Sequence, residues 1–347
     1  MRDGAMTRGM SHKREMAERL AWVAVDWGSS NLRAWAMADD GQVLARGHSD
    51  KGMLALTADA YETTLLEVIG DWLPATGRVN VLVCGMAGAR QGWREAAYVD
   101  VPTRLDELGR GAVQPPVADK RLRVYLLPGL SQRQGPHGGD FDVMRGEETQ
   151  LAGLVASDTT LSGHICLPGT HSKWACLEDG VVSGFTTYLT GELYQLLASH
   201  SVLKHSMGRD DLSDPKCRQA FTTAVRESRD APQAFSRHLF GLRAADLLDT
   251  RLPSGDARRA LLAARLSGLA IGLELAGLVG VPGEGLAAGE SVTLIGNAAL
   301  CSRYALALDA LGHPAQRVDA EAAVLAGLGL ARRFLDTSNS ATMNRNP

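Results

Sequence analysis

Short apolar runs that end in glycine turns alternate with longer helical stretches along the chain. Residues 22–26 form an apolar, β-branched run, which predicts a buried strand. A glycine turn follows, and residues 32–37 predict a second strand. The sequence Asp39-Asp40-Gly41 is typical of a tight hairpin, so residues 42–46 are expected to return as a third strand.

The same order of elements recurs in the middle of the chain. Residues 164–167 predict a strand, residues 168–172 a glycine turn, and residues 173–177 and 181–185 two strands joined by a hairpin. From turn glycine to hairpin glycine the spacing is 13 residues in the first copy (28 to 41) and 11 in the second (169 to 180). A unit repeated in each half predicts two domains related by duplication.

Strands and helices interleave in the rest of the chain, which indicates an α/β fold. Further strands are expected at 79–84, 122–127 and 291–295, and helices at 143–155, 190–197 and 319–333. The predicted organisation is a disordered leader at 1–20, an N-terminal domain at 21–157, a C-terminal domain at 158–335 with a helical insertion at about 202–258, and a disordered tail at 336–347.

The composition excludes several classes of protein. Apolar residues make up 45% of the chain, which is enough for packed cores and too many for a disordered chain. The net charge of −3 gives no basic field, so neither nucleic acid nor an anionic membrane is expected as a partner. Five scattered cysteines without a CxxC pair are typical of reduced cytoplasmic thiols, not of a disulfide framework or zinc site.

Two further segments bear on location. The leader is polar and has no apolar core, so it is not a secretory signal. The apolar stretch 266–281 is interrupted by Glu274 and several glycines and is shorter than the ~20 residues that a spanning helix needs, so it predicts a buried helix. A cytoplasmic protein is expected.

The two glycine turns have the composition of phosphate-binding loops. Glycine lets the backbone approach a ligand closely, and successive N–H groups at a strand end form a nest for phosphate oxygens. The candidate phosphate-binding residues are Gly28, Ser29 and Ser30 in the first turn and Gly169, Thr170, His171 and Lys173 in the second.

Asp26 directly precedes the first turn. A carboxylate there would repel phosphate unless a divalent cation lay between them, so Asp26 is a candidate for holding Mg²⁺ through water. Capping of its own turn is the alternative interpretation. Arg33 is a candidate for binding a substrate anion or the transferred phosphoryl group, with a plain strand-surface charge as its alternative.

Transfer of a phosphoryl group to an alcohol also needs a base near the acceptor hydroxyl. Glu147 is the first candidate, and Glu148 and Asp142 are alternatives, because acidic residues also favour a helix start for dipole reasons alone. Gly296-Asn297, after the last predicted strand, suits an adenosine, although a plain strand-to-helix turn looks the same. The sequence has no GxxxxGK[ST] loop and no GxSxG elbow.

Three motifs resemble those of a known superfamily. Asp26-x-Gly-Ser-Ser-x-x-Arg33, Pro168-Gly-Thr-His-Ser-Lys173 and Ile295-Gly-Asn297 resemble the phosphate-1, phosphate-2 and adenosine motifs of the actin/hexokinase/Hsp70 superfamily. Gly146-Glu147 is similar to the Gly-Asp element that carries the catalytic base in many sugar kinases, with Glu in place of Asp. The resemblance implies two duplicated actin-like ATPase (ribonuclease H-like) domains with a nucleotide cleft between them.

More narrowly, the chain resembles the 2-dehydro-3-deoxygalactonokinase family in segments such as VDWGSSNLRAW, CGMAGARQGWREAAYVDVP, DVMRGEETQLAGL and LPGTHSKW. The resemblance implies phosphorylation by ATP and Mg²⁺ of the 6-hydroxyl of 2-dehydro-3-deoxy-D-galactonate, in galactonate catabolism. It also implies a sugar-acid pocket on the first domain, for which the candidates are Arg33, Gly85, Met86, Arg90, Trp93 and Asp100. Arg90 is the candidate for the substrate carboxylate, since a guanidinium binds carboxylate bidentately.

Several alternatives remain open at this point. They are another sugar or sugar-acid kinase of the superfamily, an exopolyphosphatase-like hydrolase, and a non-catalytic ATP-binding regulator. A polyphosphate hydrolase would be expected to have a basic channel, which the net charge of −3 does not favour. The preference for galactonate over gluconate derivatives is open too, and a homodimer is a further expectation.

Overall fold

The computed structural model describes residues 16, 18–133, 141–278 and 285–343 of the chain. The chain forms two compact units. Unit 1 comprises Met1–Leu161, Glu178–Gly184 and Glu321–Pro347, and unit 2 comprises Ser162–Leu177 and Phe185–Ala320. Most of the predicted leader lies outside the described residues.

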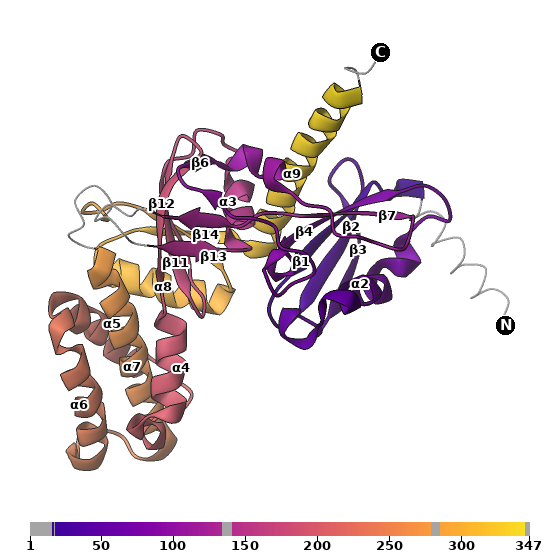
Figure 1. The fold of residues 1–347 in the computed structure, drawn as a ribbon. Coiled ribbons are helices and arrows are strands. Elements are labelled where there is room, and N and C mark those ends of the chain that lie inside the picture. Colours follow the sequence, from indigo (N-terminus) through magenta and orange to yellow (C-terminus); the bar gives the residue numbers. More distant parts are fainter. Residues whose placement is uncertain (1–15, 17, 134–140, 279–284, 344–347) are drawn as a thin grey trace, which may run out of the picture. The chain divides into compact units, whose positions relative to one another are not determined.

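Unit 1 is built on a five-stranded sheet in the order β3-β2-β1-β4-β7 (Figure 1). Its strands are β1 (Trp22–Trp27), β2 (Leu32–Met37), β3 (Val43–Ser49), β4 (Val79–Gly85) and β7 (Leu122–Leu126). β1 is antiparallel to β2 and parallel to β4. Helix α2 (Tyr61–Ile69) packs on the face formed by Val23, Val25 and Trp27, and helix α9 (Ala320–Met343) packs on the opposite face with Trp22 and Ala24.

A second, three-stranded sheet in unit 1 has the order β5-β8-β9 and leads into helix α3 (Glu147–Val155). Its strands are β5 (Val99–Asp100), β8 (Leu130–Gln132) and β9 (Asp142–Met144). The helix predicted over 143–155 therefore starts later than expected, and its first residues are a strand. The reason is Gly146, whose φ of +108° is incompatible with a helix and separates β9 from α3.

Unit 2 repeats the strand arrangement of unit 1. β10 (Gly163–Leu167) is antiparallel to β11 (Ser172–Glu178) and parallel to β13 (Val292–Gly296), as β1 is to β2 and β4. β14 (Ala315–Asp319) and β12 (Val181–Tyr188) flank these strands in the order β14-β13-β10-β11-β12. The first residues of β12, which belong to unit 1, pair with β6 (Thr103–Arg104). The duplication and the α/β class predicted from the sequence are confirmed.

Helices make up the rest of unit 2, and α4–α7 lie together in the lower left of Figure 1. They are α4 (Thr190–His200), α5 (Pro215–Asp230), α6 (Phe235–Leu248), α7 (Gly255–Leu278) and α8 (Ala298–Ala310). α7 is long and apolar enough to cross a membrane by length and composition, but 72% of its most apolar window is buried. Gly268 and Gly272 bring it against the α5 backbone at Phe221 and Val225. The prediction of a buried helix is confirmed.

Short 3₁₀ helices connect the larger elements. They are η1 (Met53–Ala55), η2 (Ala58–Ala60), η3 (Gly70–Trp72), η4 (Met86–Gly88), η5 (Leu105–Gly111), η6 (Val202–His205) and η7 (Pro232–Ala234). At the C-terminus α9 extends to Met343, through residues that the sequence analysis assigned to the tail.

Candidate active site

The first glycine turn joins β1 to β2 and is held by its own backbone and by the loop before η1. The Gly28 N–H donates to the Asn31 carbonyl at 2.8 Å. Met53 and Leu54 donate their N–H groups to the carbonyls of Gly28 and Ser29 at 3.1 and 3.0 Å. Gly52 packs so closely on this turn that a Cβ there would overlap the Ser29 backbone. Ser29 and Ser30 remain exposed, as a ligand-binding loop requires.

Asp26 and Arg33 face each other across the β1–β2 pair just before this turn. The Arg33 Nη2 to Asp26 Oδ2 distance is 2.5 Å, and the Asp26 side chain is 18% exposed. Asp26 Oδ1 lies 3.9 Å from the Cys84 thiol on β4. Arg33 thus has a carboxylate partner in the protein itself, which explains how Asp26 is held beside a candidate anion site.

The two candidate glutamates lie at the start of α3, close to the end of β4. Gly85 has a φ of +88°, and a Cβ built on Gly146 would lie 3.4 Å from the Gly85 Cα, so two glycines allow these segments to meet. Gly85 in turn contacts the backbone of Trp27 and lies near Asp26. The structure therefore brings Asp26, the end of β4 and the start of α3 together within unit 1.

Glu147 and Glu148 differ in their surroundings. Glu148 is fully buried, accepts from the Gly146 N–H at 2.6 Å, and contacts the Thr149 hydroxyl at 3.0 Å. Burial, and then the charge of Glu147, raise the pKa of Glu148 to about 8. Glu147 is half-buried and accepts from the Arg145 N–H at 3.1 Å. Asp142 lies on β9, where its carboxylate accepts from the Val143 N–H at 2.7 Å.

The remaining candidates in unit 1 differ in their exposure and in their contacts. Met86 is half-buried, and Arg90 is exposed with its Nε 3.5 Å from Glu95. Asp100 accepts from Ser131 at 2.5 Å and Arg133 at 2.8 Å, and these hydrogen bonds lower the pKa of its carboxyl group.

Trp93 is only 8% exposed, and its ring stacks on Tyr61 at a centroid distance of 5.8 Å. It packs in the core between the sheet and α2, where its ring also meets Trp27. The structure therefore places this candidate in the core of unit 1.

The second glycine turn lies between β10 and β11 in unit 2. The first turn of α4 packs directly on it, because Gly191 leaves room for the Gly169 carbonyl. The Glu192 N–H donates to the Thr170 carbonyl at 3.0 Å, and the Glu192 carboxylate lies 2.6 Å from His171 Nε2. Lys173 is buried and donates to the Thr187 hydroxyl at 2.8 Å.

The buried carboxylate of Glu274 is linked by hydrogen bonds to the strand that follows the second turn. Glu274 of α7 accepts from Trp174 at 2.6 Å and from the Tyr304 hydroxyl at 2.7 Å, and that hydroxyl lies 2.7 Å from the hydroxyl of Ser172. Burial raises the pKa of Glu274, with hydrogen bonds from Thr190 and Trp174 opposing the rise. Glu274 thereby links α7 to β11 through Trp174, to the start of α4 through Thr190, and to α8 through Tyr304.

Gly296 and Asn297 lie beside the second turn. Gly296 has a φ of +155°, and a Cβ there would lie 3.3 Å from the Pro168 carbonyl. The Asn297 side chain accepts from the N–H groups of Ala299 and Leu300, so it caps α8. The adenosine candidates and the second turn therefore adjoin within unit 2.

A cavity of about 180 Å³ opens next to these residues. Its apolar wall comes from Tyr194, Ala270, Ile271 and Leu300. At its polar end, Arg303 makes an ion pair with Asp210 at 2.5 Å and donates to Ser267 at 2.9 Å. A flat apolar group with a few polar atoms fits such a lining.

Comparison with known proteins decides the family. The family model described as 2-keto-3-deoxy-galactonokinase matches residues 26–331. The chain belongs to this family. It is 41% identical over 314 residues to a probable 2-dehydro-3-deoxygalactonokinase of Rhizobium meliloti, covering 90% of this chain and 97% of the relative. It is 33% identical over 307 residues to the 2-dehydro-3-deoxygalactonokinase of Escherichia coli, covering 88% and 96%.

A solved structure agrees with the family assignment. A putative 2-dehydro-3-deoxygalactonokinase from Sinorhizobium meliloti has a TM-score of 0.78 and 39% identity, covering 90% of this chain and 99% of that one. The expected actin-like α/β kinase fold and the expected class of enzyme, a sugar-acid phosphotransferase, are confirmed.

Within this family assignment, sequence reasoning missed Glu274 as a part of the site. Its one signal was a lone carboxylate in the apolar stretch 266–281, which was used only to argue against a membrane span. A buried carboxylate needs hydrogen-bond donors, so the sequence indicates that Glu274 has donor partners. It does not indicate that Trp174 is one of them.

Proposed function

We propose that this protein transfers the γ-phosphoryl group of ATP to the 6-hydroxyl of 2-dehydro-3-deoxy-D-galactonate, in galactonate catabolism. The family match over residues 26–331 carries the proposal, and the names of the relatives specify the sugar acid. The arrangement of Asp26, Gly85 and the start of α3 supports it, because it places an acidic group beside a phosphate-type turn. A cytoplasmic location and a homodimer belong to the same proposal.

The two glycine turns are proposed to bind the phosphates of ATP. Gly28, Ser29 and Ser30 offer exposed backbone and hydroxyl groups in unit 1, and Gly169, Thr170, His171 and Lys173 form the corresponding set in unit 2. Gly296 and Asn297, with the cavity beside them, are proposed to receive the adenosine. The apolar wall suits the base, and Asp210 and Ser267 offer polar atoms for its edge.

Magnesium fits the chemistry of Asp26. Mg²⁺ binds one or two carboxylates and otherwise keeps its water and takes phosphate oxygens. No group of three or more His, Cys, Asp or Glu residues in the described part of the chain is arranged to hold a metal. An ion held through water by Asp26 alone needs no such group. When bound, it would neutralise charge on the phosphates.

Glu147 is proposed as the base. It takes the proton of the 6-hydroxyl as the oxygen–phosphorus bond forms and the bond to the ADP oxygen breaks. Glu148, buried and bonded to Gly146, serves to hold the start of α3. Glu147 is the more accessible of the two, and this difference favours it.

The sugar acid is proposed to bind near the end of β4. Gly85 and Met86 line this region, exposed Arg90 is available for the carboxylate, and Trp93 supports the segment from the core. Asp100 is proposed to accept from sugar hydroxyls, and Arg33 to approach the transferred phosphoryl group while it orients Asp26. Binding of the carboxylate by Arg90 requires only that its long contact with Glu95 gives way.

The proposal is tested by ADP release with a panel of 2-dehydro-3-deoxy sugar acids. We expect ADP release to depend on the sugar acid and to be fastest with the galactonate derivative. Faster turnover of the gluconate derivative would replace the proposed substrate by its stereoisomer. Without turnover of any panel member, the substrate assignment would be wrong while the family assignment remained.

A pair of variants tests the base. Glu147→Gln is expected to lower kcat about 10²–10⁴-fold, the range typical of a lost general base, and to leave ATP affinity within a few-fold. Asp142→Asn is the matched control, because it removes a nearby carboxylate on β9. Turnover that survives in the first variant and is lost in the second would move the role of base to Asp142.

A further inference from the structure

Arg145 lies between β9 and α3, and two nitrogen atoms of its guanidinium group are buried without a partner. Its Nη2 donates to the Ala96 carbonyl at 2.7 Å. Its Nε and Nη1 are buried and make no hydrogen bond to any residue that the structure describes. Nη1 lies beside Gly88, where an added Cβ would be 2.9 Å away. Buried polar groups are ordinarily paired, so these two donors require an acceptor from outside the described part of the chain.

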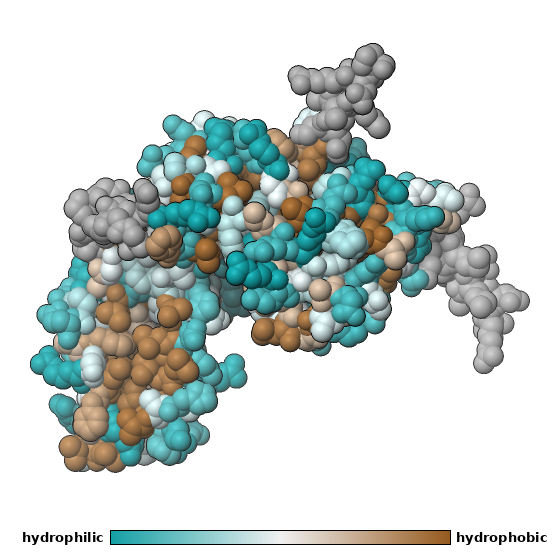
Figure 2. Space-filling view, viewed as in Figure 1, coloured by the Kyte–Doolittle hydropathy of each residue, from teal (hydrophilic) through white to brown (hydrophobic). Residues whose placement is uncertain are grey.

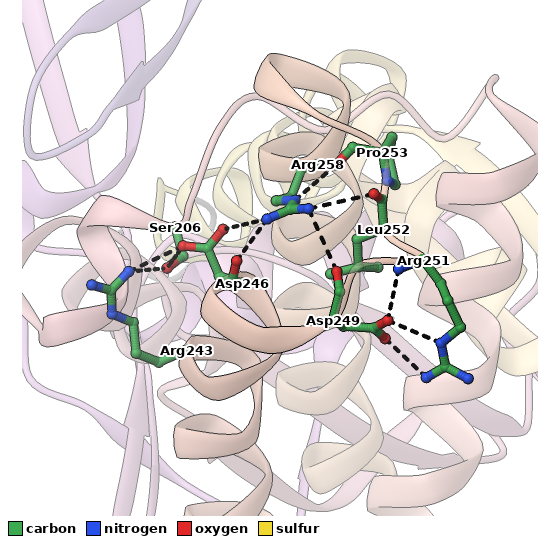
Figure 3. A network of polar contacts seen from close by, with 8 residues as sticks. All are labelled: Ser206, Arg243, Asp246, Asp249, Arg251, Leu252, Pro253 and Arg258. Carbon is green, nitrogen blue, oxygen red and sulfur yellow. Dashed lines mark hydrogen bonds and ion pairs between the residues drawn. The ribbon is translucent and has the colours of Figure 1, made fainter.

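Other arginines that are largely buried have carboxylate partners. Arg243 and Arg258 lie 3.0 and 4.0 Å from the carboxylate of Asp246 in unit 2 (Figure 3). Charged groups otherwise lie at the surface, and Figure 2 shows hydrophilic residues spread over the face of the molecule in view. Within residues 18–133, 141–278 and 285–343, Arg145 forms no ion pair. An uncompensated buried charge is costly, so an anionic ligand would stabilise this guanidinium.

The position of the guanidinium suits one end of the proposed sugar acid. The backbone N–H of Arg145 donates to the carboxylate of Glu147, the proposed base, at 3.1 Å. The side chain leads away from that contact to Ala96 and Gly88. In the sugar acid, the 6-hydroxyl and the carboxylate are at opposite ends of the carbon chain. An acid whose hydroxyl meets Glu147 presents its carboxylate a chain length away, and the guanidinium of Arg145 is one side-chain length away.

We propose that Arg145 binds the carboxylate of the acceptor and contributes more to selecting a sugar acid than exposed Arg90 does. This inference rests on the proposed kinase function. A carboxylate has about four acceptor positions, so two guanidinium groups can bind it together. The Arg90 side chain is 80% exposed, and an ion pair contributes little there. A charge-assisted hydrogen bond away from water is stronger, which favours Arg145.

The ring of Tyr98 covers this guanidinium. The Arg145 Cζ lies 4.3 Å from the ring centroid, in a cation–π contact that stabilises the charge. Tyr98 is 36% exposed and lies in irregular chain before β5, where its ring rests against Gly129. The carboxylate reaches Arg145 when this ring turns aside. Binding therefore exchanges a cation–π contact for an ion pair.

The neutral carboxamide of the sugar acid separates this role from a purely structural one. For the wild type we expect kcat/KM to be about 10–100-fold higher with the acid than with the carboxamide, the range of one hydrogen bond to a charged group. Arg145→Met should remove most of that preference, because it lowers kcat/KM mainly for the acid. Arg90→Met is the matched variant and should reduce the preference only a few-fold, as an exposed ion pair does.

Gly88→Ala provides a second arm that keeps every charge. Its Cβ would displace the guanidinium of Arg145, so KM should rise more for the acid than for the carboxamide. An unchanged preference in whichever of Arg145→Met and Gly88→Ala folds, or a preference lost in Arg90→Met alone, would overturn the inference while the sugar acid is still phosphorylated. A wild-type protein that turns over neither compound would overturn the proposed function and this inference together.

Discussion

At the scale of single residues, neighbouring Glu147 and Glu148 differ in their surroundings, because only Glu148 is fully buried, and their proposed roles follow from this difference. The pKa of Glu148 is raised to about 8 from an ordinary value of 4.5. The folded protein therefore binds this proton more tightly than the unfolded chain does. Its contribution to stability is complete below about pH 4.5 and is lost as the pH rises to about 8.

The variant Glu148→Gln tests this sign. Its free energy of unfolding, measured by denaturant titration, should fall less than that of the wild type between pH 5 and pH 8. The difference should change by roughly 1.4 kcal/mol for each pH unit in that window. Parallel stability curves for the two proteins would show that Glu148 is ionised in the folded state.

Glu147→Gln provides the second arm of the same experiment. The charge of Glu147 is the second cause of the raised pKa of Glu148, after burial. Removing that charge should lower the pKa of Glu148, because an ionised Glu148 then meets less repulsion, so the loss of stability should be smaller and should end at a lower pH.

At the scale of elements, the position of the proposed base depends on how α3 packs on α9. The two helices touch through glycines, since a Cβ on Gly153 would overlap the Ala323 carbonyl and a Cβ on Gly327 would overlap the Thr149 carbonyl. Glu147 lies in the first turn of α3. A shift of α3 away from α9 would therefore move Glu147.

Two glycines on α9 make a matched pair of variants. Gly327→Ala is expected to destabilise unit 1 by about 1–3 kcal/mol, the usual cost of overpacking, and to lower kcat as α3 moves. Gly329→Ala should instead be neutral or stabilising by up to ~1 kcal/mol, because only the flexible Arg333 side chain comes within 4.0 Å of a Cβ there and alanine favours a helix. Thermal unfolding and kcat of the two variants would distinguish them. Equal effects would contradict the close contact of the helices.

The elements also show what local sequence can predict. The hairpins at Gly41 and Gly180 were predictable, because a tight turn needs a residue with a positive φ and glycine in the local sequence indicates one. The crossing of α3 and α9 was not, since it joins residues about 170 positions apart and glycine in a helix has no local explanation. The predicted start of α3 was wrong because Val143 and Met144 were assigned to the helix, whereas they belong to β9 and Gly146 separates that strand from the helix.

The candidate site residues also divide into those that local sequence predicts and those that depend on long-range packing. Gly28 and Gly169 were predicted from strand–turn patterns and lie in the turns expected, and Gly296 is the last residue of β13. The burial of Trp93 was not visible, because an aromatic residue in a loop has the same local sequence whether it contacts substrate or stacks on Tyr61.

At the scale of the whole molecule, the duplicated units carry different chemistry. Counted from the turn glycine, Asp26 of the first copy corresponds to Leu167 of the second, and the residues opposite them on the next strand are Arg33 and Lys173. The Asp26–Arg33 ion pair has no counterpart at this position of unit 2, and Glu147 and Glu148 also lie in unit 1. In the second copy the apolar Leu167 stands where Asp26 stands in the first, and its strand partner Lys173 donates to Thr187 instead of to a carboxylate. Trp174, the next residue, donates to Glu274. This difference supports the proposed binding of the acceptor by unit 1 and of the adenosine by unit 2.

This division predicts separate footprints in hydrogen exchange. ADP with Mg²⁺ should slow amide exchange in residues 168–173 and at the start of α8, and more weakly at the turn 28–31. The sugar acid alone should slow exchange at 85–100 and leave α8 unchanged, because its proposed contacts lie in unit 1. Protection of α8 by the sugar acid alone would contradict the division. Tyr304→Phe should weaken the ADP footprint but not that of the sugar acid, since its hydroxyl joins Ser172 to Glu274 in unit 2.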